Sequence, residues 1–351
     1  MPELMSFLKD LIRLPGLSGH EEPVRKLIAE AWQPLVDEIG TSRLGSLHAL
    51  KRGSAPEPRQ SLLIATHMDA IGLMVNGVKG EFLSVAEVGG VDPRVLPGQL
   101  VTVHGRKELP GVIAQPPAHL LPPDNTHGAV SLGNLLVDTG LEAGELSRLV
   151  RPGDLVSFAQ EPIELRNDIL AGHTLDNRAS VAALTACLEE LSGRRTNWDV
   201  WAVATVQEEE TLGGAATSIF QLRPSLAVAV DVTFATSPGT PSNKAYEMGK
   251  GVTLCVGPNI HPGMYKAFKD IAEKLEIPYK MEVTGASSGT DAYAMQVAAE
   301  GFPTMVISIP LRYMHTPVEV VSMKDIARAG RLLAAFAASL DDQFMDTLKL
   351  D

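Results

Sequence analysis

Cysteine is nearly absent from this chain, since only Cys187 and Cys255 occur among its 351 residues. Cys187 lies in a helix-like apolar pattern and Cys255 in a strand-like one, so we expect both in the core. Two isolated cysteines exclude a disulfide framework and a metal site built from thiolates. So little cysteine fits a reducing compartment, and we expect a cytoplasmic protein.

The chain also has no surplus of basic residues and no long hydrophobic run. Its 30 Lys and Arg residues are outnumbered by 42 Asp and Glu residues, which gives a formal net charge of -12. Nucleic acids and anionic membranes both require a basic face, so both are disfavoured as partners. The amino-terminal sequence is amphipathic and interrupted by charges, which argues against a signal peptide or a membrane span: MPELMSFLKDLIRLPG.

Strand and helix patterns alternate in the two parts of the chain that lie before and after residues 72–158. Short apolar runs rich in β-branched residues predict buried strands at residues 61–66, 198–206, 225–230 and 302–309. Apolar residues at helical spacing predict helices at residues 3–14, 21–32, 176–193, 264–275 and 322–340. The last of these has a capping-box-like start at Ser322. The alternation predicts an α/β fold with a mostly parallel sheet flanked by helices.

The stretch between residues 72 and 158 has a different texture. Glycine and proline are frequent, the apolar segments are short and often alternate, and no long helical period occurs. This pattern predicts a small β-rich domain inserted into a larger one. We expect a discontinuous larger domain at residues 1–70 and 162–351 and the inserted domain at residues 71–161. Three histidines of the insert are expected to have structural or surface roles: His104, His119 and His127.

Three consecutive carboxylates follow the predicted strand 198–206. They are Glu208, Glu209 and Glu210, and glycines come directly after them. Side chains alternate across a strand, so Glu208 and Glu209 are expected to point to different places. Taken alone, the stretch is equally consistent with a solvated acidic turn and with a functional site.

Other polar residues in the chain favour the site. In an open α/β sheet, ligands bind beyond the carboxyl ends of the strands. Polar residues that follow predicted strands, or that open a predicted helix, are therefore the candidates: His67, Asp69, Asp176, Glu208, Glu209, Asp231 and His315. Each is weak evidence alone, but all are expected at one edge of the sheet. Imidazoles and carboxylates without thiolates suit zinc, cobalt or manganese.

Several motifs carry a resemblance to a known family. These are HMDAIG, LDNR, VQEEETLGGA, VDVT, SGTDA and RYMHTPVE. With them the chain resembles the M42 family of dinuclear metalloaminopeptidases, which includes the tetrahedral (TET) aminopeptidases. The similarity covers nearly the whole chain, and the joint order and spacing of the motifs are highly specific. The substrate class follows from this resemblance and not from composition or periodicity.

The resemblance implies a ligand set for two divalent metal ions per subunit. Asp176 would bridge the two ions. His67 and Asp231 would complete one metal site, and Glu209 and His315 would complete the other. We expect zinc, with cobalt or manganese as alternatives.

The resemblance also implies roles for residues that are not ligands. Glu208 would be the general base, and Asp69 would hydrogen-bond the far nitrogen of His67 and so orient the ring. The peptide bond after the bridging aspartate can be cis in this family, so Asp176-Asn177 is a candidate. Glu210 is left without a catalytic role.

By resemblance, we expect a metal-dependent aminopeptidase that removes amino-terminal residues from short peptides. The larger domain would be the zinc-peptidase-like catalytic domain. The insert would mediate dimerisation, and dimers could build a twelve-subunit tetrahedral shell.

Other functions stay open on the sequence alone. One alternative is a deacylase or carboxypeptidase-like amidohydrolase with the same kind of dinuclear site, and a more distant one is a non-catalytic metal-binding scaffold. A cellulase is disfavoured, because sugar hydrolysis normally uses two carboxylates and no metal. The preferred amino-terminal residue is undetermined, and three lysines that could enter the pocket are expected on the surface: Lys244, Lys250 and Lys280.

Overall fold

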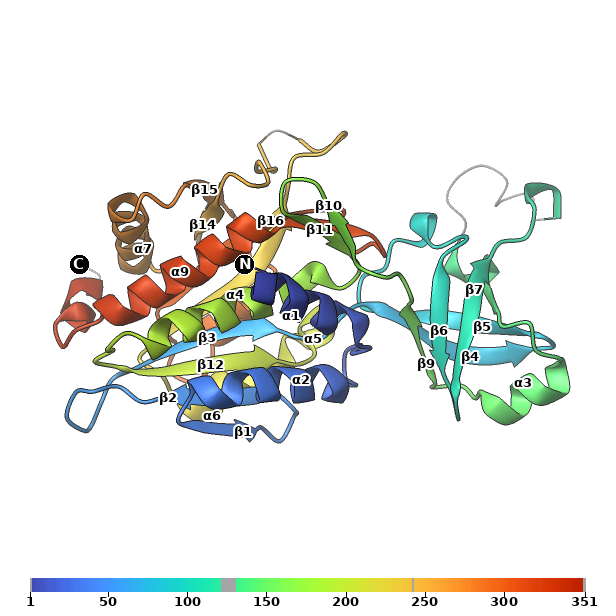
Figure 1. Ribbon diagram of the computed structural model, residues 1–351, viewed down its shortest axis with the longest axis horizontal. Coiled ribbons are helices and arrows are strands. Elements are labelled where there is room, and N and C mark those ends of the chain that lie inside the picture. The colour runs from blue at the N-terminus through green and yellow to red at the C-terminus, as the bar shows by residue number, and fades with distance from the viewer. Residues whose placement is uncertain (1, 121–130, 242, 350–351) are drawn as a thin grey trace.

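The computed structural model describes residues 2–120, 131–241 and 243–349. Figure 1 shows two bodies, a large α/β domain and a small β-barrel at one end of it. The expected α/β fold with a separate β-rich domain is confirmed. His127 lies outside the described residues. None of the helices within these ranges is long and apolar enough to cross a membrane.

The large domain is built on an 11-stranded mixed sheet, counted over the described residues. The strand order is β1-β2-β12-β3-β13-β16-β17-β11-β10, with β14 paired to β16 and β15 to β14. The bounds are β1 Glu38–Thr41, β2 Leu47–Lys51, β3 Ser61–His67, β10 Ile163–Leu165, β11 Ile169–Gly172, β12 Asp199–Thr205, β13 Leu226–Phe234, β14 Val252–Val256, β15 Tyr279–Val283, β16 Thr304–Arg312 and β17 Glu319–Ser322.

The centre of this sheet is parallel. Strands β12, β3, β13 and β16 run in one direction, so their carboxyl ends meet at one edge. Thr205 of β12 pairs with His67 of β3, which fixes the height at which His67 leaves the sheet. Strands β3 and β13 are buried along almost their whole length. Burial on both faces explains why their sequences are continuous apolar runs.

Helices flank the sheet (Figure 1). Their bounds are α1 Pro2–Arg13, α2 Glu22–Trp32, α4 Leu175–Ser192, α5 Glu208–Thr211, α6 Gly213–Leu222, α7 Pro262–Lys274, α8 Asp291–Gln296 and α9 Met323–Ser339, with 3₁₀ turns η1 Gln33–Leu35 and η6 Phe344–Leu348. Helices α4 and α9 pack closely against each other. Gly330 of α9 permits this contact, because a Cβ there would lie 2.6 Å from the carbonyl oxygen of Ala183.

The small domain is a closed barrel with the strand order β4-β5-β8-β7-β6-β9. Its elements are β4 Gly72–Lys79, β5 Phe82–Val88, η2 Pro93–Val95, β6 Leu100–His104, β7 Glu108–Ala114, η3 Ala118–Leu120, η5 Leu132–Asn134, β8 Leu136–Asp138, α3 Ala143–Leu149 and β9 Leu155–Phe158. Closure pairs each of these described strands with a neighbour on both sides. The barrel has its own hydrophobic core, which includes Leu73, Val103 and Val137 and is separate from the core of the large domain.

Three local predictions from the sequence are wrong. Strand β13 continues to Phe234, so Asp231 lies inside the strand instead of beyond its end. Glu208 begins the one-turn helix α5, so the geometry of a helical turn, and not strand alternation, directs it and Glu209 to different places. Ser322 precedes α9 but makes no capping hydrogen bond with its side chain. In each case the tertiary surroundings decide the local conformation.

Candidate metal centre

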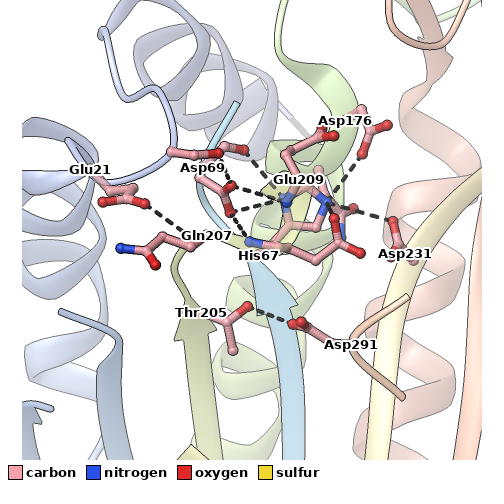
Figure 2. Close-up of polar contacts among 12 residues, drawn as sticks. Glu21, His67, Asp69, Asp176, Thr205, Gln207, Glu209, Asp231 and Asp291 are labelled. Atoms are coloured by element: carbon pink, nitrogen blue, oxygen red, sulfur yellow. Dashed lines mark hydrogen bonds and ion pairs between the residues drawn. The ribbon is translucent and has the colours of Figure 1, made fainter. Parts of the chain in front are cut away.

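His67 lies at the carboxyl end of β3, and its two ring nitrogens face different groups. Nε2 lies 3.2 Å from Oδ1 of Asp176 and 3.9 Å from Oδ1 of Asp231. Nδ1 lies 3.4 Å from Oδ1 of Asp69, on the opposite side of the ring (Figure 2). The ring is almost fully buried. This arrangement leaves Nε2 to face the carboxylate cluster while Asp69 lies behind the ring.

Asp176 stands between two histidines. Its Oδ1 faces His67, and its Oδ2 lies 3.5 Å from Nε2 of His315. The backbone N–H of Asp176 donates to Glu319 Oε2 at 2.9 Å, and the bond to Asn177 is cis, as the resemblance implies. Each carboxylate oxygen of Asp176 is therefore directed to a different imidazole.

The three consecutive carboxylates, Glu208, Glu209 and Glu210, lie in a tight helical turn that directs them to different places. Gln207 has a φ of 56°, in the left-handed region, and the one-turn helix α5 begins at the next residue. Glu208 Oε2 then lies 3.7 Å from Nε2 of His67, whereas Glu209 Oε2 lies 3.5 Å from Nε2 of His315. Glu210 faces the barrel instead and accepts a hydrogen bond from the Gly89 N–H at 2.7 Å.

The barrel side of the molecule also positions His315. This residue lies in the loop between β16 and β17 with a φ of 61°. Its Nδ1 lies 3.0 Å from the carbonyl oxygen of Gly90, which follows β5 of the barrel. Its backbone N–H donates to Glu319 Oε1 at 3.1 Å. The inserted segment therefore reaches the cluster through backbone groups.

Buried carboxylates dominate the electrostatics of the cluster. Burial, reinforced by neighbouring carboxylates, raises the pKa of Glu208 and of Glu209 above the ordinary value for glutamate. Burial alone would also raise the pKa of Asp176, but the hydrogen bonds with His315 and His67 lower it below its ordinary range. The contact with Asp176 raises the pKa of His315 to about 9. The cluster thus concentrates negative charge and favours cations.

Three supporting residues were missed by the sequence reasoning. Glu319 is fully buried and accepts the backbone N–H groups of both Asp176 and His315. Glu21 accepts the N–H of Gln207 at 3.2 Å and so supports the turn before Glu208. Asp291 accepts the Thr205 hydroxyl at 2.5 Å beneath the cluster (Figure 2). Asp291 and Glu319 lie in two of the motifs that carry the resemblance, SGTDA and RYMHTPVE, which was the available signal.

The side chains present fit divalent metal ions. One ligand atom each from His67, Glu208 and Asp231 lie within 4.8 Å of one another, and so do atoms of His67, Asp176 and Glu209. Oε1 of Glu209 is buried and has no hydrogen-bond partner in the described structure. An uncompensated buried carboxylate oxygen is costly, and a cation removes that cost. Nitrogen and oxygen ligands of this kind suit zinc, cobalt or manganese.

The cluster opens into a cavity of about 440 Å³. The cavity is lined by six of the seven candidate residues, all except the fully buried Asp69. Apolar side chains from β13 and from the loops also line it, including Val232, Phe234 and Met314. A concave site with convergent polar groups on one side is typical of an enzyme for small substrates.

Comparison with known proteins identifies the family that carries this site. The profile of the M42 glutamyl aminopeptidase family matches residues 45–332, most of the chain. The chain belongs to the M42 peptidase family.

Relatives of this M42 peptidase match it along nearly its whole length. The lysyl aminopeptidase of Pyrococcus furiosus is 35% identical over 95% of this chain and 96% of the relative. The structure of aminopeptidase APDkam598 from the archaeon Desulfurococcus kamchatkensis is 32% identical, with a TM-score of 0.91, and covers 100% of this chain and 98% of its own. The TET1 peptidase of Pyrococcus horikoshii, which can assemble into a tetrahedron or a large octahedral shell, is 30% identical, with a TM-score of 0.84, over 96% of this chain and 100% of its own.

Membership of the M42 family settles the general class of activity. The protein is a peptide-bond hydrolase of the aminopeptidase type, and its family is metal-dependent. The family, the fold class and the enzyme class that the sequence predicted are confirmed.

Proposed function

We propose that this M42 peptidase removes amino-terminal residues from short peptides at a centre of two divalent metal ions. The observation that carries the proposal is the position of Asp176, whose two carboxylate oxygens face two different histidines. A carboxylate in this position is suited to bridge two cations. The geometry supports His67 and Asp231 as the other ligands of one ion, and Glu209 and His315 as those of the second.

We propose zinc as the metal, with cobalt or manganese as alternatives, because the ligand atoms are imidazole nitrogens and carboxylate oxygens. Two such ions, when bound, would supply Lewis acidity for activating a water nucleophile and the scissile carbonyl. Glu208 lines the cavity beside His67 and is not needed as a further ligand if each ion has a histidine, an acid and the shared Asp176. Glu208 therefore accepts the proton of the attacking water and passes it to the leaving amine.

Asp69 has a positioning role in this proposal. It is fully buried, does not line the cavity and lies behind the His67 ring. It also accepts the backbone N–H groups of Glu208 and Glu209, at 3.0 and 3.2 Å. One buried carboxylate thus orients a proposed ligand and the turn that carries the proposed base.

The experiment that tests the proposal compares free and amino-terminally blocked substrates. The protein is stripped with a chelator, reloaded with zinc, cobalt or manganese, and assayed with aminoacyl p-nitroanilides and their N-acetyl forms. We expect turnover only after metal is restored and only with free amino termini. Equal cleavage of acetylated substrates would favour the deacylase or carboxypeptidase-like alternative. Metal binding without turnover of any substrate would favour a non-catalytic scaffold.

We also propose a domain division and an assembly. The catalytic domain comprises residues 1–70 and 162–351, and residues 71–161 form the dimerisation domain, a division supported by the two separate hydrophobic cores. Leu100 and Leu120 of the barrel are exposed apolar residues that a partner subunit could cover. The shell formed by the Pyrococcus horikoshii relative supports an assembly of dimers into a tetrahedral dodecamer. Size-exclusion chromatography with light scattering distinguishes a dimer from a dodecamer.

We also propose that the protein is cytoplasmic. Cys187 and Cys255 are both free and buried, as expected of a protein from a reducing compartment. Fractionation of cells that produce the protein, followed by detection in the soluble and envelope fractions, tests this location.

A further inference from the structure

The cavity above the proposed metal centre contains a carboxylate that the proposed chemistry does not use. Glu282 of β15 lines the cavity together with Thr233, Phe234 and Met314. The other acids in the lining are Asp176, Glu208, Glu209 and Asp231, all assigned above to metal binding or proton transfer. Among the described residues, Glu282 is therefore the one lining acid left to meet a substrate.

Two buried hydroxyl groups hold the carboxylate of Glu282 in place. Thr233 of β13 donates to Oε1 at 2.6 Å, and Thr253 of β14 donates to Oε2 at 2.5 Å. Both threonines are buried in the sheet, whereas Glu282 is partly exposed. Each carboxylate oxygen has a second lone pair, so both oxygens can accept a further hydrogen bond. The carboxylate of Glu282 is thus held in one orientation and can still accept hydrogen bonds.

The negative charge of Glu282 is not neutralised by any basic side chain in the part of the protein that the structure describes. Over residues 2–120, 131–241 and 243–349, no lysine, arginine or histidine forms an ion pair with it within 4.0 Å. Burial, together with the charge of Glu282, raises the pKa of the nearby Tyr246 phenol to about 12. A fixed, partly desolvated carboxylate without a counter-ion is a recognition site for a cation.

The remaining lining of the cavity fits the rest of a long basic side chain. Leu212, Val232 and Met314 offer apolar contacts for the methylene groups of a lysine or arginine. Within the described structure, no lysine or arginine lines the cavity, so an acidic side chain would meet Glu282 without a compensating cation. Lys250 and Lys280 line a different surface cavity, so neither serves this site.

We propose that Glu282 sets the substrate class, so that the cavity takes an amino-terminal lysine or arginine whose cationic end group pairs with this carboxylate. The inference rests on the proposed aminopeptidase function and specifies its substrate. Glu282 binds the substrate side chain and takes no part in proton transfer.

The test compares four substrates on the metal-loaded full-length enzyme: the p-nitroanilides of lysine, arginine, leucine and glutamate. We expect kcat/KM for lysine and arginine to exceed that for leucine by about tenfold or more, with glutamate the slowest. Glu282→Gln keeps the size and one acceptor oxygen but removes the charge. It should lower kcat/KM for lysine by about tenfold or more, mainly through KM, and leave that for leucine within about twofold.

Glu247→Gln is the matched control, because Glu247 is an exposed acid that lines the neighbouring cavity with Lys250. It should leave all four values unchanged. A wild-type enzyme that prefers leucine or glutamate to lysine would overturn the inference while leaving the aminopeptidase function intact. Equal losses for lysine and leucine in Glu282→Gln would assign Glu282 a merely structural role and also overturn it. Failure to hydrolyse any free substrate would overturn the proposed function, and the inference with it.

Discussion

Replacement of Asp69 by asparagine tests how the centre is held together without touching a proposed ligand or the proposed base. Asp69 lies behind His67, and its two oxygens serve different neighbours. Oδ1 faces Nδ1 of His67 and accepts the Glu208 N–H, whereas Oδ2 accepts the Glu209 N–H and the Ser18 hydroxyl. Asparagine has the same shape but only one acceptor oxygen. Whichever way the amide is turned, its NH₂ group faces donors that the carboxylate satisfied.

The expected magnitude follows from the hydrogen bonds that are lost. Leaving a buried backbone N–H of Glu208 or Glu209 without an acceptor costs about 1–3 kcal/mol. Since about 1.4 kcal/mol corresponds to a tenfold change in an equilibrium constant, this cost corresponds to roughly ten- to hundredfold in metal affinity. Loss of a carboxylate behind a metal-binding histidine typically has an effect of the same size. We therefore expect Asp69→Asn to lower both metal affinity and kcat by about one to two decades.

The assay is a competitive metal titration with a chromophoric chelator, followed by turnover at saturating metal. Ser18→Ala is the graded control, because it removes only the 2.6 Å hydrogen bond from the Ser18 hydroxyl and leaves both backbone donors paired. Its effect should stay within about 1 kcal/mol. An Asp69→Asn protein with wild-type metal affinity and wild-type kcat would refute a positioning role for Asp69.

Three further predictions concern other parts of the fold. Gly330→Ala should lower the free energy of unfolding by about 1–3 kcal/mol in denaturant melts, because its Cβ would lie 2.6 Å from a carbonyl oxygen of α4. Gly144→Ala in α3 is the control. Its Cβ would meet no atom within 4 Å, so the change should be neutral or slightly stabilising. Burial lowers the pKa of His48 from 6.5 to about 4. The unfolded chain is therefore protonated first, so stability is complete above about pH 6.5 and falls by up to about 3 kcal/mol toward pH 4, a loss that His48→Gln should remove in melts across this range. Gly90→Ala would place a Cβ 2.9 Å from Nδ1 of His315 and should lower the metal affinity by about tenfold in the chelator titration, without changing the melting temperature. Gly133→Ala is the control. The nearest atom to its Cβ would lie at 3.8 Å, so it should change neither the metal affinity nor the melting temperature.

The sequence was sufficient for features that depend on local pattern or on chain direction. The continuous apolar runs of β3, β12 and β13 indicated buried parallel strands, and parallel strands bring their carboxyl ends together. This reasoning located His67 and the acidic turn near each other. It did not require the exact strand ends, so the misplacement of Asp231 beyond β13 had no effect on the candidate set.

The sequence was insufficient where a side chain acts through a distant backbone group. Glu319 accepts the N–H of His315, 4 residues away, and the N–H of Asp176, 143 residues away. The contact with Asp176 is the one that shows its support of the centre, and sequence spacing does not reveal it. Glu210 meets Gly89 of the inserted segment, 121 residues away. Periodicity reports which face of an element is buried and not which partner it meets. Glu282 was missed for the same reason, since β15 pairs at the edge of the sheet and reads as an ordinary polar strand.

The most direct test of the central claim is metal stoichiometry and turnover, measured together on wild type and Glu208→Gln. Elemental analysis after reconstitution should give two ions per chain for both proteins, because Glu208 is the proposed base and not a ligand. The kcat of Glu208→Gln with a free aminoacyl p-nitroanilide should fall by about two decades or more. Loss of one ion in the variant would make Glu208 a ligand, and wild-type turnover with two ions bound would contradict its role as the general base.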